Sequence, residues 1–181
     1  LLTFVALLAI VVAYLIRVGS SASVYSQTVD EPYHVGAAVA LWEKKQHVLG
    51  VQHPPLPRWV AGAPMVAMGA ALPRESPDLS AARKEDVAYE VGTAILTSQG
   101  SGHYFDLLTA GRWAMLLFPA VALVYAFLLG KFLLDARAGL AAALLLSLDT
   151  TLLGHGMWIG TDGAAAAGFL AAIYHGLRFV H

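Results

Sequence analysis

Two adjacent carboxylates, Asp30 and Glu31, follow the first apolar segment of the chain, within the stretch VDEPYH. A carboxylate near a membrane surface could act as a general base that accepts a proton from a hydroxyl group. Asp30 also suits the N-cap of a helix, where its side chain would accept hydrogen bonds from free backbone N–H groups. The pair is therefore either a helix cap with a solvated neighbour or the catalytic part of a site.

A second group of polar residues lies in the stretch HPPLPRW at residues 53–59. Its prolines favour a stiff, extended segment that would hold His53 and Arg58 at fixed positions. A guanidinium group suits phosphate and tryptophan suits the membrane interface, so Arg58 and Trp59 could bind a lipid headgroup. The alternative is a stiff loop with a surface histidine.

A third group lies in DTTLLGHGMWIGTD, residues 149–162. Asp149 falls inside an apolar run, where a charged group is costly and is a functional candidate. The alternative is an aspartate that is hydrogen-bonded within a bundle and steadies helix packing. His155 and Asp162 lie at a helix end and in the following turn, where Asp162 could also cap the next helix.

The seven histidines raise the question of a metal site. The chain has no HExxH motif and no cysteine, so no standard ligand spacing is present and we assign no metal ligand. A divalent metal shared by Asp30, Glu31, His53 or His155 stays open. A basic patch with interleaved aromatic residues is lacking, which argues against nucleic acid as a partner.

These polar groups are separated by apolar segments. Of the 181 residues, 58% are hydrophobic and 13% are charged, and the mean hydropathy is +0.65. Soluble domains carry about 25% charged residues. Apolar segments of about 17–25 residues can cross a bilayer as helices. We expect spans at about 1–17, 113–131, 138–155 and 163–180, which predicts an all-α fold: a polytopic membrane helical bundle.

Residues 19–111 form the long connection between the first two expected spans, and we expect this connection to be an external loop. A helix over 31–45 and another over 58–72 are predicted to be interfacial, lying on the membrane, since neither suits a span. Residues 73–104 are the most polar part. They predict a loop, a short helix and then a flexible turn at SQGSGHY.

The basic residues of the short connections indicate the orientation. Lys131, Arg137 and Arg178 fall on the side opposite to loop 19–111, and the positive-inside rule makes their side cytoplasmic. The loop would then be periplasmic or otherwise external. The same count of spans puts the carboxylate pair and the connection with Asp162 on one membrane face.

The order of these motifs resembles a known family. The stretches DE, HPPL, TAGRW and LSLDTTLLGHGMWIGTD follow one another across nearly the whole chain. This order resembles the N-terminal part of membrane glycosyltransferases of the GT-C type, in the dolichyl-phosphate-mannose–protein mannosyltransferase and aminoarabinose-transferase-like group. Thr150 and Thr151 stand where bacterial members of that group are expected to have Pro-Asn.

The resemblance implies that the chain is an N-terminal fragment of a larger enzyme of the bacterial inner (plasma) membrane. Such an enzyme transfers a sugar, with inversion, from a lipid-linked polyprenyl-phosphate donor to a hydroxyl group of a protein or lipid acceptor. Asp30 would be the general base, and Glu31 would position the acceptor or support Asp30. His53, His155 and Asp162 would line the same external pocket, next to membrane lipids.

Two other functions remain open from the sequence. The chain could be a non-catalytic four-helix membrane subunit of a larger complex, with Asp149 and the histidines as structural contacts. It could also be one half of a transporter, with Asp149 as a proton or ion site.

Overall fold

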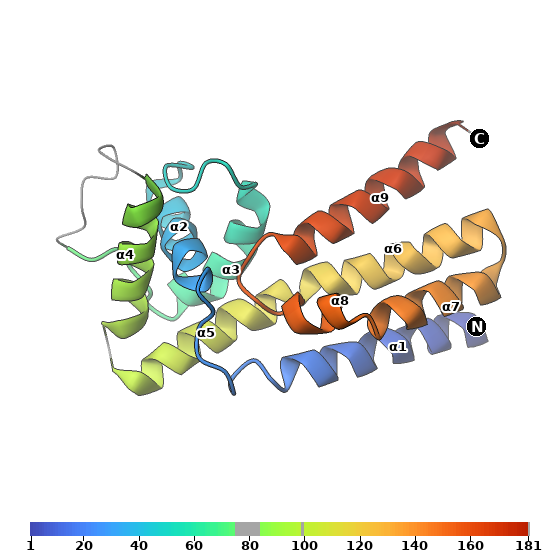
Figure 1. Ribbon diagram of the computed structural model, residues 1–181, viewed down its shortest axis with the longest axis horizontal. Coiled ribbons are helices and arrows are strands. Elements are labelled where there is room, and N and C mark those ends of the chain that lie inside the picture. The colour runs from blue at the N-terminus through green and yellow to red at the C-terminus, as the bar shows by residue number, and fades with distance from the viewer. Residues whose placement is uncertain (75–83, 99, 181) are drawn as a thin grey trace. The chain divides into compact units, whose positions relative to one another are not determined.

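The computed structural model describes residues 1–74, 84–98 and 100–180 (Figure 1). Within these ranges the regular secondary structure is entirely helical, which confirms the all-α prediction. The chain divides into two compact units. We call residues 1–20, 116–157 and 162–181 the apolar unit, and residues 21–115 with 158–161 the α2–α5 unit.

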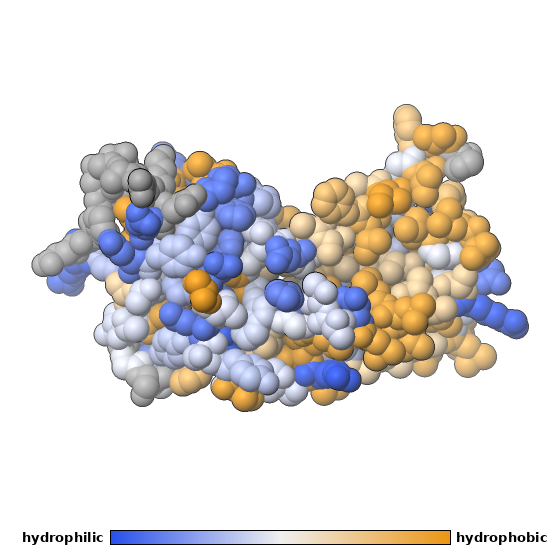
Figure 2. All heavy atoms as spheres, viewed as in Figure 1, coloured by the Kyte–Doolittle hydropathy of each residue, from blue (hydrophilic) through white to orange (hydrophobic). Residues whose placement is uncertain are grey.

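The apolar unit is built around α6, which packs against α7 and α9, while α1 packs against α7 and α6. Figure 2 shows apolar side chains covering the visible face of these helices. Its helices are α1 (Leu2–Gly19), α6 (Leu117–Leu133), α7 (Ala136–Ser147), α8 (Thr150–His155) and α9 (Asp162–Val180).

Three helical segments in the described part of the chain are long and apolar enough to cross a membrane. They are Leu2–Gly19, Gly102–Leu133 and Asp162–Val180. They correspond to the first, second and fourth expected spans. By length and composition, the chain is therefore a candidate membrane protein.

The expected third span differs, because it is not one continuous helix. α7 ends at Ser147 and α8 begins at Thr150, and the Asp149 side chain caps α8 by accepting a hydrogen bond from the Leu152 N–H at 2.8 Å. With 12 residues, α7 is about 18 Å long, shorter than the hydrocarbon core of about 30 Å. Asp149 is thus a helix cap, and the four-span count that put the two acidic motifs on one face is not supported.

In the α2–α5 unit, α2 (Glu31–Lys44) packs against α3 (Pro55–Ala67) and α4 (Lys84–Thr97), and α3 packs against α5 (Ser101–Met115). The contact between α2 and α4 depends on two glycines. A Cβ atom on Gly36 would collide with the Ala88 carbonyl group, and one on Gly92 with the Pro32 carbonyl group. The two backbones can approach so closely because neither glycine has a side chain.

The predicted helix over 31–45 exists as α2, but the prediction that it lies on a membrane surface is wrong. Every residue of α2 from Glu31 to Leu41 is buried. An interfacial helix needs a broad polar face toward water, and this part of α2 has none. Its small side chains instead let other helices pack around it, so α2 is the internal helix of its unit.

Two other local expectations differ. HPPLPRW is extended only at Pro54, the N-cap of α3, and Pro55 then lies in the first helical turn, where a missing N–H costs nothing. The turn predicted at SQGSGHY ends earlier, because Gly100 has a φ of +87° and α5 begins at Ser101. The loop predicted over 75–83, and residue 99 of that turn, lie outside the described residues.

Candidate functional site

A buried ion pair joins the first residue of α2 to α5. The Arg112 Nε and Nη2 atoms donate to the two carboxylate oxygens of Glu31, at 2.8 and 2.7 Å, and both side chains are fully buried. This paired, two-point geometry is the strongest form of contact between a guanidinium group and a carboxylate. It fixes the start of α2 against α5.

The same two side chains also hold segments without helical structure. Arg112 donates to the carbonyl oxygens of Ala22, Tyr25 and Ser26 at 2.7, 2.7 and 2.9 Å. Glu31 accepts from the backbone N–H groups of residues 28 and 159, at 2.8 and 3.2 Å. The ring of residue 158, a tryptophan, lies 4.5 Å from the guanidinium carbon. The ion pair therefore organises residues 21–29 and 158–161 together.

This environment bears on the role expected for Glu31, which was to position the acceptor or to support Asp30. Both carboxylate oxygens are engaged and no part of the residue is exposed, so Glu31 has no surface through which it could contact an acceptor. Its geometry is that of a residue that positions its neighbours. Of the two roles expected for Glu31, this geometry suits the support of Asp30 and not contact with an acceptor.

Asp30, directly before Glu31, is exposed. It occupies the N-cap position of α2, yet its side chain makes no capping hydrogen bond. Its Oδ1 atom instead accepts a hydrogen bond from the Tyr89 hydroxyl group of α4 at 2.9 Å. The capping interpretation therefore holds for the position of Asp30 but not for its carboxylate, which α4 holds at the surface of the unit.

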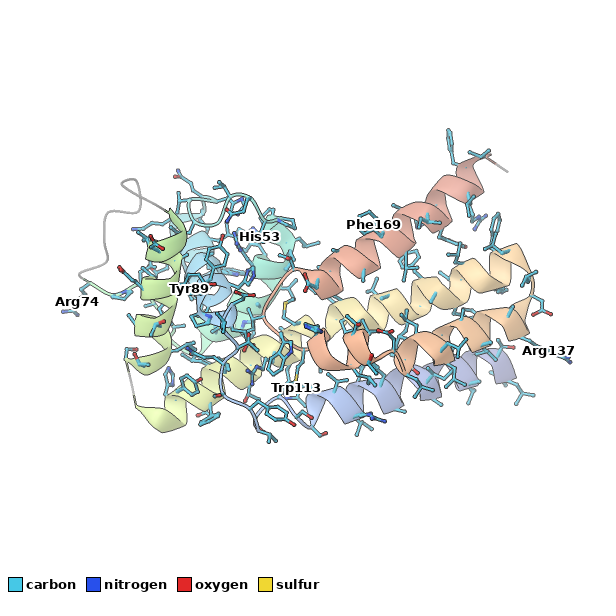
Figure 3. The ribbon with its side chains drawn as sticks, viewed as in Figure 1. His53, Arg74, Tyr89, Trp113, Arg137 and Phe169 are labelled. Atoms are coloured by element: carbon cyan, nitrogen blue, oxygen red, sulfur yellow. The ribbon has the colours of Figure 1, made fainter. Side chains whose placement is uncertain are left out.

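Aromatic rings connect Asp30 to the residues of HPPLPRW. The Tyr33 ring lies 5.3 Å from the Tyr89 ring and 5.7 Å from the His53 ring, measured between centroids. The His34 ring is 5.1 Å from Tyr33 and 5.2 Å from His53. Figure 3 labels His53 and Tyr89, which come from the loop before α3 and from α4. These rings form one contiguous cluster.

Arg58 is only 1% exposed, and its guanidinium carbon lies 5.4 Å from the centroid of the Tyr33 ring. Its Nη1 atom donates to the carbonyl oxygens of Leu49 and Gly50 at 2.9 and 2.6 Å and lies 2.9 Å from the His47 Nε2 atom. Its Nε and Nη2 atoms have no hydrogen-bond partner, and no acidic side chain in the described ranges pairs with it. Burial lowers the pKa of the Arg58 guanidinium, an effect that the Tyr33 side chain opposes.

His34 is held in its neutral form. Burial, followed by the charges of Arg58 and His53, lowers its pKa from 6.5 to about 4, although Asp30 acts in the opposite direction. Burial and Arg58 also lower the pKa of His47. The neutral imidazole of His34 therefore interacts electrostatically with both the Asp30 carboxylate and the Arg58 guanidinium group.

The structure thus brings Asp30, His53 and Arg58 together. The other two predicted site residues, His155 and Asp162, belong to the apolar unit. His155 ends α8, and its Nδ1 atom is 3.1 Å from the Thr151 carbonyl oxygen. Asp162 is the exposed first residue of α9. Among the described residues, no group of three or more His, Asp or Glu side chains is placed to hold a metal ion.

Sequence reasoning missed four members of the site: Tyr33, His34, Tyr89 and Arg112. His34 follows Asp30 by four residues, so helical periodicity could have placed both on one face. Tyr89 is 59 residues from Asp30, and no local pattern points to it. Arg112 was noted within TAGRW without a role.

Comparison with known proteins identified no matching family model, no matching curated protein and no matching solved structure. The resemblance to membrane glycosyltransferases therefore stays a prediction.

Proposed function

We propose that this chain contributes the acceptor-activating part of a membrane glycosyltransferase, which moves a sugar from a polyprenyl-phosphate donor to a hydroxyl group. The observation that carries the proposal is the setting of Asp30. Its carboxylate is exposed, it is oriented by Tyr89, and the next residue is locked in a buried ion pair. A fixed, accessible carboxylate is what general-base catalysis requires.

In the proposed reaction, Asp30 accepts the proton of the acceptor hydroxyl group. The acceptor oxygen then forms a bond to the anomeric carbon as the bond from that carbon to the lipid phosphate breaks, which inverts the configuration. The lipid phosphate leaves with the electron pair. Because Tyr89 occupies Oδ1, the proton would be taken by the Oδ2 atom of Asp30.

The negative charge that develops on the leaving phosphate needs a nearby cation. Arg58 supports this part of the proposal, because it is buried, carries no acidic partner in the described ranges and retains two unpaired nitrogen atoms. A guanidinium in such a setting acts through a lower effective dielectric than one in water. His53, half-buried between the aromatic rings and the surface, would contact the phosphate directly.

The test is sugar transfer by the protein reconstituted in liposomes with a polyprenyl-phosphate-linked sugar. Asp30→Asn should lower the rate at least about 100-fold, the scale of lost general-base catalysis. Asp106→Asn, at another exposed carboxylate of the same unit, should retain the wild-type rate. Equal rates for the two variants would contradict the role of Asp30.

A non-catalytic membrane subunit is the alternative, and one observation favours it. Both carboxylates of the DE motif have partners inside their own unit, as a purely structural pair would. On this view Glu31→Gln, but not Asp30→Asn, would disrupt assembly with other chains of a native complex. Co-purification from the native membrane measures this directly.

A further inference from the structure

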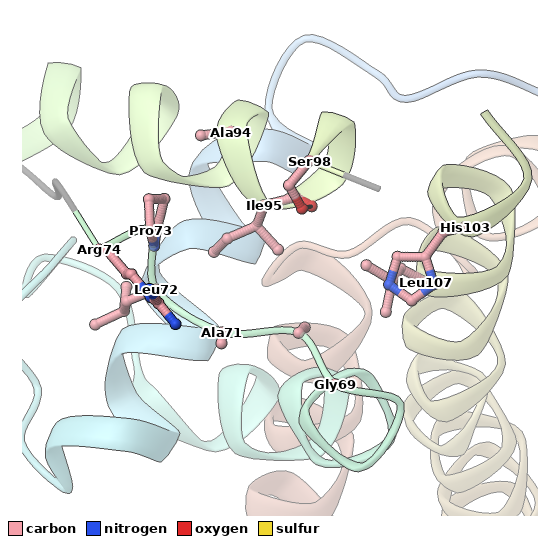
Figure 4. A pocket seen from close by; sticks show the side chains of 11 residues that line it. Gly69, Ala71, Leu72, Pro73, Arg74, Ala94, Ile95, Ser98, His103 and Leu107 are labelled. Atoms are coloured by element: carbon pink, nitrogen blue, oxygen red, sulfur yellow. Dashed lines mark hydrogen bonds between the residues drawn. The ribbon is translucent and has the colours of Figure 1, made fainter. Parts of the chain in front are cut away.

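A cavity of about 450 Å³ lies within the α2–α5 unit, away from the residues of the candidate site (Figure 4). Its walls come from residues 69–74, from the end of α4 and from the first turns of α5. None of the residues in the Asp30 cluster lines it. Its volume is within the range of about 300–1,000 Å³ that is usual for small-molecule sites.

The walls are mostly hydrocarbon and are held in place. Ile95 and Leu107 are buried and face the cavity from α4 and α5. The Leu72 N–H donates to the Glu43 carboxylate at 2.8 Å, and this bond anchors residues 69–74, the wall that follows α3. Gly69, with a φ of +94°, allows the sharp turn after α3 that starts this segment.

Besides the Ser98 hydroxyl group, which donates to the Ile95 carbonyl oxygen at 3.0 Å, two polar groups of different kinds line the cavity. The Nε2 atom of His103 is buried and has no hydrogen-bond partner. Figure 4 shows the His103 imidazole directed from α5 toward the space between α4 and residues 69–74. Arg74 lines the other side and is exposed, and the described lining contains no acidic residue. The cavity therefore combines apolar walls, one unsatisfied imidazole nitrogen and one cation at its edge.

We propose that this cavity binds a compact amphiphilic anion. Its apolar body would pack against Ile95 and Leu107, and its carboxylate or phosphate group would pair with Arg74. A polar atom of the ligand would satisfy His103 Nε2, which otherwise stays buried without a partner. This inference does not depend on the proposed sugar transfer, since none of the residues that carry that proposal lines the cavity.

The test uses the full chain in nanodiscs of zwitterionic lipid, with ¹⁵N-labelled histidine. The His103 resonances are assigned with a His103→Gln variant. Octanoate and octyl phosphate should shift them saturably, and 1-octanol, which lacks the charge, should bind at least tenfold more weakly. The proposal is overturned if the anions produce no saturable shift, as for a cavity that holds water alone, or if octanol binds equally well.

Three variants separate binding in the cavity from general effects on the unit. Ala94→Trp would fill the cavity and should abolish the shift, whereas Thr93→Trp, at an exposed position of the same helix, should leave it unchanged. Arg74→Gln lies at an exposed position where folding should not be affected, and it should remove the preference for anions over octanol. Wild-type anion preference in Arg74→Gln would refute the assigned role.

The same resonances distinguish two sources of the anion. A shift in discs of phosphatidylglycerol, without added octanoate, would identify a membrane lipid as the occupant. A shift that appears only with the added anion would identify a free small molecule.

Discussion

The two units use similar residues in opposite ways. Helices α2 and α9 are both rich in alanine and glycine, yet α2 is buried from Glu31 to Leu41, whereas the only buried residue of α9 is Ala167. The α2–α5 unit also buries charged side chains, while the apolar unit exposes large hydrophobic ones such as Phe169 and Phe179 (Figures 2 and 3).

This difference in exposed and buried side chains indicates which surroundings, lipid or water, suit each unit. A unit that exposes apolar helices and buries no charged side chain among its described residues suits lipid, because lipid does not penalise hydrocarbon surface. A unit with a buried ion pair and a more polar surface suits water or an interface. The composition of α2 and α9 does not show that one is buried and the other exposed. The helices that pack against each of them decide this difference.

The largest expected effect comes from breaking the buried ion pair of the α2–α5 unit. Arg112→Ala leaves the Glu31 carboxylate and three backbone carbonyl groups without their donor, and should lower the free energy of unfolding by about 3–5 kcal/mol. Arg137→Ala, at an exposed arginine of the apolar unit, should change it by less than about 0.5 kcal/mol. Denaturant unfolding in detergent micelles measures both.

If both arginine variants were equally stable, the ion pair would not be the element that holds the α2–α5 unit together. Hydrogen exchange gives a second check, because the loss in Arg112→Ala should be largest at residues 21–31.

The second effect concerns pH. His34 has a folded-state pKa of about 4, below its ordinary value of 6.5, so the unfolded chain binds the proton more readily. The stability associated with neutral His34 is therefore complete above pH 6.5 and is lost as the pH falls toward 4, by about 3 kcal/mol in all.

The measurement compares wild-type protein with His34→Gln between pH 7 and pH 4. The wild type should lose more stability across this range, because the variant has no group to protonate at that position. Arg58, His53 and Asp30 face His34 in both proteins, so their contributions are shared to first order. Parallel pH profiles would show that His34 is not the responsible group.

The smallest expected effect comes from substituting one glycine in each unit. Gly92→Ala would place a methyl group against the Pro32 carbonyl group, and we expect it to cost about 1–3 kcal/mol of stability. Gly168→Ala on α9 meets no described atom within 4 Å, and it should stabilise the helix by up to about 1 kcal/mol. Thermal unfolding measures the change in Tm of each variant. Changes of opposite sign would support the contrast between the two units, and changes of the same sign would contradict it.

Local pattern was sufficient to predict much of the fold. Long apolar runs predicted the three membrane-length helices found among the described residues, and the motif DEP predicted the start of α2. The break at Asp149 was missed because an aspartate can either interrupt an apolar helix or be tolerated inside one. Which of these occurs depends on whether the side chain caps the next turn, as it does here.

The burial of α2 and the partners of Asp30 could not be predicted in the same way. Both depend on contacts with residues far along the chain, such as Gly92 and Tyr89 on α4. A single sequence carries no signal for such pairs. Asp30, His53 and Arg58 were named from the sequence as separate candidates, but the rings of Tyr33 and His34 that connect them were not.

The ion pair between Glu31 and Arg112 has a consequence for the synthesis of the chain. Glu31 is bound by a residue 81 positions later, and its bond to the N–H of Ile159 closes over 128 positions. At about 5–20 residues per second, a ribosome needs roughly 4–16 s to add those 81 residues. The Glu31 carboxylate is thus synthesised several seconds before the guanidinium group that pairs with it. Until Arg112 has been added, the negative charge of Glu31 lacks this ion-pair partner.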